Sequence, residues 1–266
     1  MDIIERSQGA LRWLTCRALD EAGVVNAFTT RLGGVSSGEF ESLNLAVSRG
    51  DDRDCVRSNY GIISLALGIS PASLAFSRQV HGDAVRAVTS ADIKKDLFDP
   101  VPYEADGLMT DERGVSLIIH IADCEGILLY CRKPEAVAAV HAGWRGTVAD
   151  IAGKAVAAMQ REYGCDPGDM VAALAPCASV CCYEVGPEVV EAVERLPIDV
   201  KDLVVPTRDG HAKIDIKGIN AALLRRAGVR DIYVSPDCTM CLPDKYWSHR
   251  ITAGRRGAQA CIIALK

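Results

Sequence analysis

Residues 115–140 read VSLIIHIADCEGILLYCRKPEAVAAV and contain the densest set of apolar runs in the chain. The three runs, at 115–121, 126–131 and 136–140, are rich in Val, Ile, Leu and Ala and are separated by short polar breaks. Apolar runs of this length, bounded by polar residues, are typical of buried β-strands. The stretch therefore predicts three neighbouring strands at the centre of the fold.

The rest of the chain predicts further strands and helices on both sides of this stretch. Expected strands span residues 11–16, 24–30, 74–80, 84–88, 171–174, 232–235 and 260–265. Expected helices span residues 51–67, 147–163, 187–193 and 215–227. Thr147 is the expected cap of the second helix, whose N-terminus is a candidate anion site. Because strands outnumber helices and many connections are short, we expect one compact α+β domain over residues 1–266, with mixed, largely antiparallel sheets flanked by helices.

The composition indicates a globular protein that binds small molecules. The chain has 266 residues, of which 49% are hydrophobic, and a net charge of -5. No apolar run approaches the roughly 20 residues of a membrane-spanning helix, and the first residues lack the pattern of a signal peptide. The mildly acidic balance disfavours a nucleic-acid surface, which needs clustered Lys and Arg. We therefore expect a cytoplasmic protein without a membrane or nucleic-acid partner, and the sequence leaves its oligomeric state open.

The 11 cysteines are an odd number in a chain too long to need covalent staples, which argues against a disulfide framework. Most of them lie among apolar residues and are best interpreted as small core side chains. A late group contains Cys177, Cys181, Cys182, Cys238 and Cys241. A second zinc site and a redox switch are alternatives for this group, but no redox-type βαβ context surrounds it, so we favour unpaired thiols.

Two histidines and one cysteine in three short motifs form a candidate metal site. They are His81 in Gln-Val-His-Gly, Cys124 in Ala-Asp-Cys and His141 in His-Ala-Gly-Trp-Arg-Gly. Imidazole and thiolate are ligands that zinc prefers, and three protein ligands leave a fourth position for water or substrate. No local spacing groups the three residues, so their spacing by itself gives weak support for a metal role.

A series of motifs along the chain resembles the laccase-domain family. In order, the motifs are Arg-Leu-Gly-Gly-Val-Ser-Ser-Gly from residue 31, Ser-Leu-Asn-Leu from 42, Gln-Val-His-Gly from 79, Ala-Asp-Gly-Leu-Met-Thr from 105, Ala-Asp-Cys from 122, His-Ala-Gly-Trp-Arg-Gly from 141 and Cys-Tyr-Glu-Val-Gly from 182. The resemblance extends from about residue 26 to the C-terminus. Members of this family were first called multicopper polyphenol oxidases and are now described as purine nucleoside phosphorylases with adenosine deaminase activity.

The resemblance implies a zinc-dependent purine nucleoside phosphorylase that acts on adenosine, inosine and S-methyl-5'-thioadenosine and also deaminates adenosine. It implies that His81, Cys124 and His141 bind the metal, which is zinc, or copper in its place. The older oxidase name requires more imidazoles than the chain offers. A blue-copper centre takes two His and one Cys, and a multicopper oxidase needs a further imidazole-rich cluster, whereas the chain has 5 His.

The chain departs from the family pattern beside two of these motifs. Glu125-Gly126 follows Ala-Asp-Cys, where the family usually has a variable residue and then proline. Residues 175–179, Ala-Pro-Cys-Ala-Ser, stand where Gly-Pro-Ala-Ile-Gly is common. We expect these changes to alter the pocket wall, and hence substrate preference, rather than the metal ligands.

Several residues near the motifs are candidates for the chemistry that the resemblance implies. Phosphorolysis requires a phosphate site, for which Arg145, just before the predicted helix, is the first candidate. Arg31 and Asn44 are further candidates for phosphate or sugar contacts. Deamination at C6 of adenine by water activated on zinc also requires a carboxylic acid that moves protons. Asp123 and Glu184 are the candidates for that role, although strand alternation can turn Asp123 away from the metal.

Two other functions use the same residues. In a cysteine hydrolase, Cys124 is the catalytic nucleophile and His81 or His141 is the base, so that iodoacetamide inactivates the enzyme and a chelator does not. A non-catalytic metal-binding or assembly protein retains zinc but converts no nucleoside at any phosphate concentration.

Overall fold

The computed structural model describes residues 2–266, and the three predicted central strands are present in it. They are β7 (Ser116–Ile121), β8 (Glu125–Arg132) and β9 (Glu135–Ala142). β8 and β9 form an antiparallel hairpin along their whole length. β7 pairs instead with β15 (Gln259–Ala264), in a different sheet. Residues 122–124 therefore carry the chain directly from one sheet to the other.

Two six-stranded sheets and one three-stranded sheet form the framework. The other strands are β1 (Ile3–Gln8), β2 (Leu11–Cys16), β3 (Val25–Thr29), β4 (Leu74–Ala75), β5 (Val85–Ala87), β6 (Gly107–Thr110), β10 (Met170–Leu174), β11 (Glu184–Val185), β12 (Val204–Pro206), β13 (Ala212–Ile214) and β14 (Asp231–Val234). The strand orders are β1-β2-β3-β15-β7-β4, β14-β10-β8-β9-β6-β5 and β11-β13-β12. Pairing is antiparallel except between β4 and β7, β5 and β6, and β10 and β14. The predicted fold class, α+β with mixed and largely antiparallel sheets, is confirmed.

The two large sheets pack face to face, and helices cover their outer faces. In β7, Leu117 and Ile119 lie in the core between the sheets, whereas Ile118 lies in the outer core beneath helix α2 (Arg53–Leu67). In β8, Leu128 faces the core between the sheets and Leu129 faces the opposite helices. Since successive strand residues point to opposite faces, a strand covered on both sides must be apolar throughout. This explains the continuous apolar runs of the sequence.

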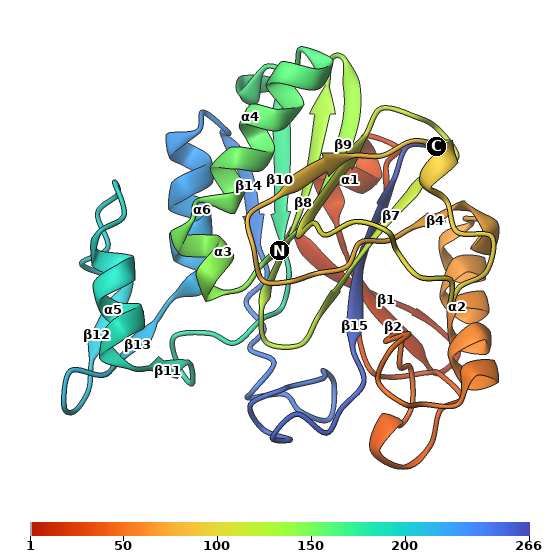
Figure 1. Ribbon diagram of the computed structural model, residues 1–266, viewed down its shortest axis with the longest axis horizontal. Helices are drawn as coiled ribbons and strands as arrows, with labels where there is room; N and C mark the ends of the chain where they lie inside the picture. The colour runs from red at the N-terminus through yellow and green to blue at the C-terminus, as the bar shows by residue number, and fades with distance from the viewer. Residues whose placement is uncertain (1) are drawn as a thin grey trace.

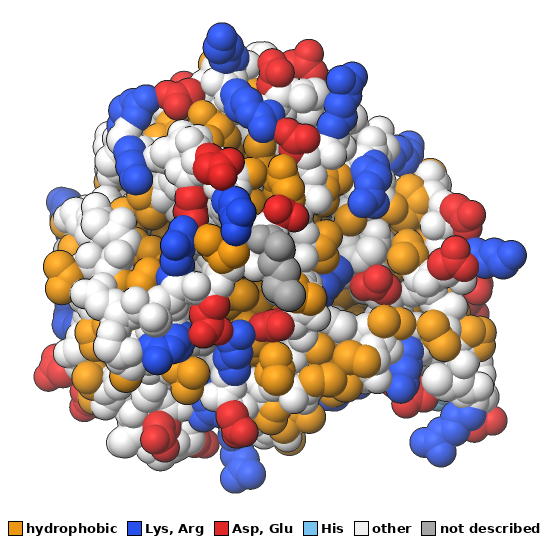
Figure 2. All heavy atoms as spheres, turned by 180° about the vertical axis from the view of Figure 1, so that it is seen from behind, with side chains coloured by type: hydrophobic (Ala, Val, Ile, Leu, Met, Phe, Trp, Pro, Cys, Tyr) orange, Lys and Arg blue, Asp and Glu red, His pale blue; other side chains and the backbone are white. Residues whose placement is uncertain are grey.

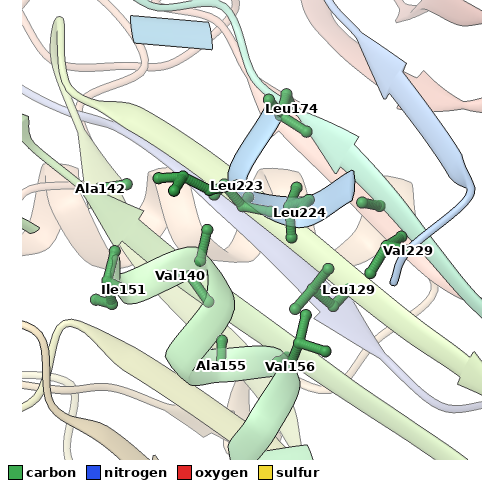
Figure 3. Packing of buried hydrophobic residues seen from close by; sticks show 14 of the residues in the cluster. Leu129, Val140, Ala142, Ile151, Ala155, Val156, Leu174, Leu223, Leu224 and Val229 are labelled. Carbon is green, nitrogen blue, oxygen red and sulfur yellow. The ribbon is translucent and has the colours of Figure 1, made fainter. Parts of the chain in front are cut away.

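The other helices are α1 (Arg17–Glu21), α3 (Trp144–Val148), α4 (Ile151–Tyr163), α5 (Pro187–Glu194) and α6 (Ile216–Arg226). Figure 1 shows α4 and α6 side by side over the sheet that contains β8 and β10, and α2 over the other sheet. Val156 of α4 and Leu223 of α6 pack on Leu129 and Val140 of the sheet (Figure 3). The resulting layer order is helix, sheet, sheet, helix.

The predicted helix at 147–163 is wrong at its start. Two helices, α3 and α4, occupy this region, and the chain turns between them at Asp150, which has a left-handed φ of 56°. The Asp150 carboxylate accepts a hydrogen bond from the Gly153 amide and caps α4. Thr147 therefore lies inside α3 and is not a helix cap, and the Asp150 carboxylate occupies the N-terminus of α4.

Other differences concern short or polar elements. The expected strands at 74–80 and 84–88 are reduced to β4 and β5, which belong to different sheets. The strands β1 and β6, the helix α1 and the small sheet β11-β13-β12 were not predicted. Figure 1 shows that small sheet, together with α5, projecting at the left of the two large sheets.

No helix within residues 2–266 is long and apolar enough to cross a membrane. On the face of the molecule drawn in Figure 2, Lys and Arg side chains are interspersed with Asp and Glu. No continuous basic surface is visible on this face of the described chain. The face therefore lacks the clustered positive charge that nucleic-acid binding requires.

Candidate metal centre

The structure brings together the three residues predicted as metal ligands. His81 lies between β4 and β5, Cys124 lies in the link between β7 and β8, and His141 lies near the end of β9. One ligand atom from each residue lies within 4.8 Å of the other two. The two imidazole rings meet edge to face with their centroids 4.9 Å apart. Two nitrogens and one sulfur thus converge from three separate segments.

Asp106 orients two of these ligands and was not predicted from the sequence. Its buried carboxylate accepts hydrogen bonds from the amides of Val80, His81 and Gly82. One of its oxygens also lies 2.7 Å from Nδ1 of His141, which leaves Nε2 of that ring for the metal. A carboxylate behind a metal-binding histidine fixes the ring in this way in many metal sites. The available signal was a lone acid between Ala105 and Gly107, inside a motif of the resemblance.

The backbone at His81 is held in a conformation that residues other than glycine rarely adopt. His81 has a left-handed φ of 60°, which costs an L residue about 1 kcal/mol or more. The three amide hydrogen bonds to Asp106 stabilise this turn. Strain of this kind persists where the surroundings over-determine the backbone, and it is common at functional sites.

The ionisation of Cys124 and that of His141 depend on each other. Burial raises the pKa of the Cys124 thiol, but the charge of His141 and hydrogen bonds from His141 and His81 outweigh burial and lower the pKa from 9.0 to about 6. Burial lowers the pKa of His141, but the Cys124 thiolate and Asp106 outweigh burial and raise it to about 9. The pair thus favours the thiolate, the form of Cys124 that binds zinc or copper, and a bound cation would displace the proton from the His141 ring.

Gly143 leaves open the space in which the ligands meet. A Cβ at this position would lie 3.1 Å from Cδ2 of His81 and 3.2 Å from the sulfur of Cys124. Any side chain here would crowd the cluster. The donor set and the open space both fit a zinc ion bound by three protein ligands.

Asp123 forms the other strained turn of the site, with a φ of 81°. Its carboxylate accepts hydrogen bonds from the hydroxyls of Thr239 and Ser248 and from the amide of Arg250. These contacts bind the turn that carries Cys124 to the C-terminal segment. Glu184, the other predicted acid, lines a neighbouring hollow and accepts a hydrogen bond from Thr207.

A cavity of about 250 Å³ opens beside the cluster and includes His81, Cys124 and His141 in its wall. A second cavity, of about 190 Å³, shares His81, Cys124, Ala122, Arg49 and Arg256 with the first. The shared residues make the two cavities lobes of one cleft. The wall of the first lobe combines charged and polar side chains with apolar ones such as Phe76 and Val101, and the wall of the second includes Trp144 and Tyr183.

Arg49 and Arg256 place positive charge in this cleft, and neither was predicted as a site residue. No carboxylate forms an ion pair with either guanidinium within residues 2–266. The Nε of Arg256 is buried and has no hydrogen-bond partner in the same range. Burial and the neighbouring charge of Arg49 lower the pKa of Arg256 to about 10. Two adjacent cations without an acid partner form a site for an anion.

The three residues predicted to bind phosphate or sugar lie elsewhere. Arg145 is exposed on α3, and its guanidinium stacks on the ring of Trp144. Arg31 donates hydrogen bonds to the carbonyls of Glu41 and Pro243. Asn44 is fully buried and holds the backbone at Ala46 and Ala258, two residues of the cavity wall. None of the three lines the cleft itself.

Two departures from the family pattern contact each other behind Cys124. The Cys177 thiol donates a hydrogen bond to Oε2 of Glu125 at 3.1 Å, and both residues are fully buried. Burial raises the pKa of Glu125 to about 7. A buried acid and a buried thiol that form a hydrogen bond are a matched pair, because either one alone would leave an unsatisfied polar group.

His120, on the wall of the cavity, gives the fold a pH-dependent stability. Its Nε2 lies 2.7 Å from the Tyr60 hydroxyl, and burial lowers its pKa from 6.5 to about 4. The unfolded chain takes up this proton near pH 6.5 and the folded chain only near pH 4, so the stabilisation is complete above pH 6.5 and is lost as the pH falls towards 4. Acid therefore lowers the free energy of unfolding, and we expect His120→Phe to reduce this decrease by about 1–3 kcal/mol.

Urea unfolding at neutral and at mildly acidic pH measures this effect. The matched control is His211→Phe, because His211 is exposed in the turn between β12 and β13. An equal decrease in the free energy of unfolding on acidification in the two variants would contradict the assignment to His120.

Known proteins are similar to this chain along almost its full length. A family model described as multi-copper polyphenol oxidoreductase laccase matches residues 25–266. Purine nucleoside phosphorylase YlmD of Geobacillus stearothermophilus is 36% identical over 264 residues, which cover 96% of this chain and 95% of that protein. Adenosine deaminase RL5, from an unknown prokaryotic organism, is 34% identical over 243 residues, which cover 87% of this chain and 91% of that protein. The crystal structure of hypothetical protein YfiH of Bacillus licheniformis has a TM-score of 0.92 at 30% identity and covers 98% of this chain and 99% of that chain.

Proposed function

The chain belongs to the multi-copper polyphenol oxidoreductase laccase family, and from this premise we propose that it is a zinc-dependent purine nucleoside phosphorylase. Its proposed substrates are adenosine, inosine and S-methyl-5'-thioadenosine, with phosphate as the second substrate. Adenosine deamination is proposed as a companion activity. The names of the similar proteins, purine nucleoside phosphorylase and adenosine deaminase, support both parts of the proposal.

The observation that carries the proposal is that the metal-ligand cluster shares one cleft with two arginines that form no ion pair with a carboxylate of the described chain. Arg49 and Arg256 line both lobes together with His81 and Cys124. Phosphate bound to the two guanidiniums would therefore lie next to the cluster, at the junction of the lobes. Guanidinium groups suit phosphate because their N–H groups match pairs of phosphate oxygens.

The residues of the chain divide the remaining work. The first lobe includes Phe76, whose ring offers an aromatic wall to a purine base. His81, Cys124 and His141 hold the metal, and Asp106 orients the two histidines. A bound zinc ion supplies Lewis-acid stabilisation of developing negative charge. Copper fits the same donors, but neither proposed reaction transfers an electron.

Of the two carboxylates predicted to move protons, we assign Asp123 to positioning. All of its hydrogen bonds hold the backbone turn of Cys124 against the C-terminal segment. Glu184 lies in the adjoining hollow, and its backbone carbonyl accepts a hydrogen bond from Arg250, which lines the second lobe. A proton-transfer role for Glu184 requires substrate to extend from the cleft into that hollow.

The proposal is tested by assaying each of the three nucleosides with and without phosphate. We expect release of free base only when phosphate is present, and release of ammonia from adenosine without that requirement. Iodoacetamide-sensitive hydrolysis that a chelator leaves unchanged would favour the cysteine hydrolase. Retention of zinc without turnover of any nucleoside would favour the non-catalytic protein.

The arginine pair gives a separate prediction. Removal of one charge-assisted contact costs about 1.5–3 kcal/mol, so we expect Arg256→Ala to raise the KM for phosphate about 10- to 100-fold. Arg145→Ala is the matched control, since Arg145 is the phosphate ligand expected from the sequence. We expect it to change that KM by no more than about threefold. The reverse ranking of the two variants would return the phosphate role to Arg145.

A further inference from the structure

Four of the five cysteines in the late group form a second cluster. Cys181 and Cys182 precede β11, and Cys238 and Cys241 follow β14. Their four sulfur atoms all lie within 4.8 Å of one another. The sulfur of Cys241 is 3.5 Å from that of Cys181 and 3.2 Å from that of Cys182. Cys177 is not part of the cluster, because its thiol is buried against Glu125.

Four converging thiols match the ligand set of a structural zinc ion. A tetrahedral site with zinc–sulfur distances of about 2.3 Å places its sulfur atoms about 3.8 Å apart, which is within the spread of the observed separations. We propose that Cys181, Cys182, Cys238 and Cys241 bind a second zinc ion in a closed four-thiolate site, distinct from the centre at His81. The proposal is independent of the proposed function.

The backbone around Cys238 is arranged as it is around a metal-bound thiolate. The amide of Ser179 donates a hydrogen bond to the Cys238 sulfur at 3.4 Å, and the amides of Met240 and Cys241 also contribute. Lys213 adds a positive charge beside Cys181, because its Nζ donates a hydrogen bond to the Cys181 carbonyl at 2.9 Å. Amide donors and a nearby cation stabilise negatively charged sulfur.

The exposure of the cluster argues against ordinary core packing. Cys181 and Cys241 are exposed, Cys182 is half-buried, and only Cys238 is buried. Buried cysteines pack as small apolar side chains, but two exposed thiols gain little from such packing. The sequence by itself favours unpaired thiols. The four cysteines converge only when the turn before β11 and the turn after β14 meet in the folded protein.

The second zinc ion would fasten two segments that support the first centre. One segment donates the Ala178 amide to the carbonyl of Asp123. The other donates the Thr239 hydroxyl to the carboxylate of the same residue. Both contacts hold the turn next to Cys124. The four-thiolate site therefore has a positioning role and does not touch the cleft.

Zinc content per chain tests the proposal without reference to enzyme activity. After purification in reducing buffer with zinc, the unmodified chain should hold about two zinc ions. Cys182→Ser/Cys241→Ser should lose one ion and keep the one at His81, whereas His81→Ala should lose the other. Cys55→Ser is the matched control, because this half-buried thiol lies outside both clusters, and it should keep both ions.

Cobalt substitution provides a second readout on the unmodified chain and does not depend on the folding of a variant. We expect the unmodified chain and His81→Ala to show the intense sulfur-to-cobalt charge-transfer bands of a four-thiolate site, and Cys182→Ser/Cys241→Ser to keep only the weaker band of the single thiolate Cys124. A single zinc ion that is lost only in His81→Ala would overturn the proposal. So would thiol counting that shows Cys181, Cys182, Cys238 and Cys241 paired as disulfides in the same preparation.

Discussion

Cys124→Ser is expected to lose the zinc ion of the His81 centre and to lower phosphorolysis by roughly 10³-fold, the size of effect seen when a charge-stabilising group is removed from an active site. The substitution removes the only sulfur of the cluster and leaves two imidazoles, His81 and His141. A serine hydroxyl is not deprotonated at neutral pH and binds zinc poorly, so the remaining ligands hold the metal weakly.

Metal analysis beside the phosphate-dependent assay measures this effect, with Cys55→Ser as the control that changes a thiol outside the centre. His81→Ala separates the metal from a catalytic thiolate, because it leaves Cys124 in place. Full activity of zinc-free His81→Ala would contradict the metal assignment. We expect Cys124→Ser and His81→Ala both to lose the metal and to be inactive.

Asp106→Asn is expected to lower the affinity of the centre for zinc by about 10- to 100-fold. The carboxylate accepts three backbone hydrogen bonds and also contacts Nδ1 of His141. An amide has one acceptor oxygen, so its NH₂ group would face either an amide N–H or the histidine ring. Both the turn at His81 and the orientation of His141 should therefore loosen.

Competition with a chromophoric zinc chelator measures the affinity of Asp106→Asn. Asp92→Asn is a suitable control, since the Asp92 carboxylate caps a short helical turn at the surface and pairs with Arg86. Zinc affinity equal to that of the unmodified chain would show that Asp106 has no part in orienting the ligands. A thermal melt of the metal-free form separates this effect from a general loss of stability.

The elements that were predicted correctly are those with a strong local pattern. The strands β7, β8 and β9 are covered on both faces, so their apolar runs were evident. The helix α2 has an Asp52 cap and ends at Gly68, which adopts a left-handed φ of 68°. The local signals and the final structure agree at both ends of this helix.

The elements that were missed depend on contacts between distant segments or on short polar sequences. The break at Asp150 interrupts an otherwise helical pattern, because its carboxylate caps α4 instead of continuing a helix from Thr147. The small sheet has strands of two or three residues, such as β11, whose sequences carry little periodicity. Periodicity cannot identify strands that short.

The site was predicted only in part, because some of its residues meet through contacts between distant segments. His81, Cys124 and His141 were identified through motifs, and their convergence follows from the crossing of the chain between the two sheets at residues 122–124. Arg49 and Arg256 belong to loops that meet only in the folded chain. A solvated surface arginine has the same local sequence signature, and these two are distinguished only in the structure, where both line the two lobes of the cleft beside Cys124.

The most direct test of the central claim is a titration of zinc into the stripped protein, with phosphate-dependent release of hypoxanthine from inosine as the readout. We expect no release from the stripped protein, recovery in proportion to zinc bound at His81, Cys124 and His141, and no recovery in Cys124→Ser. Release from the stripped protein at the same rate as from the reloaded protein would contradict the claim.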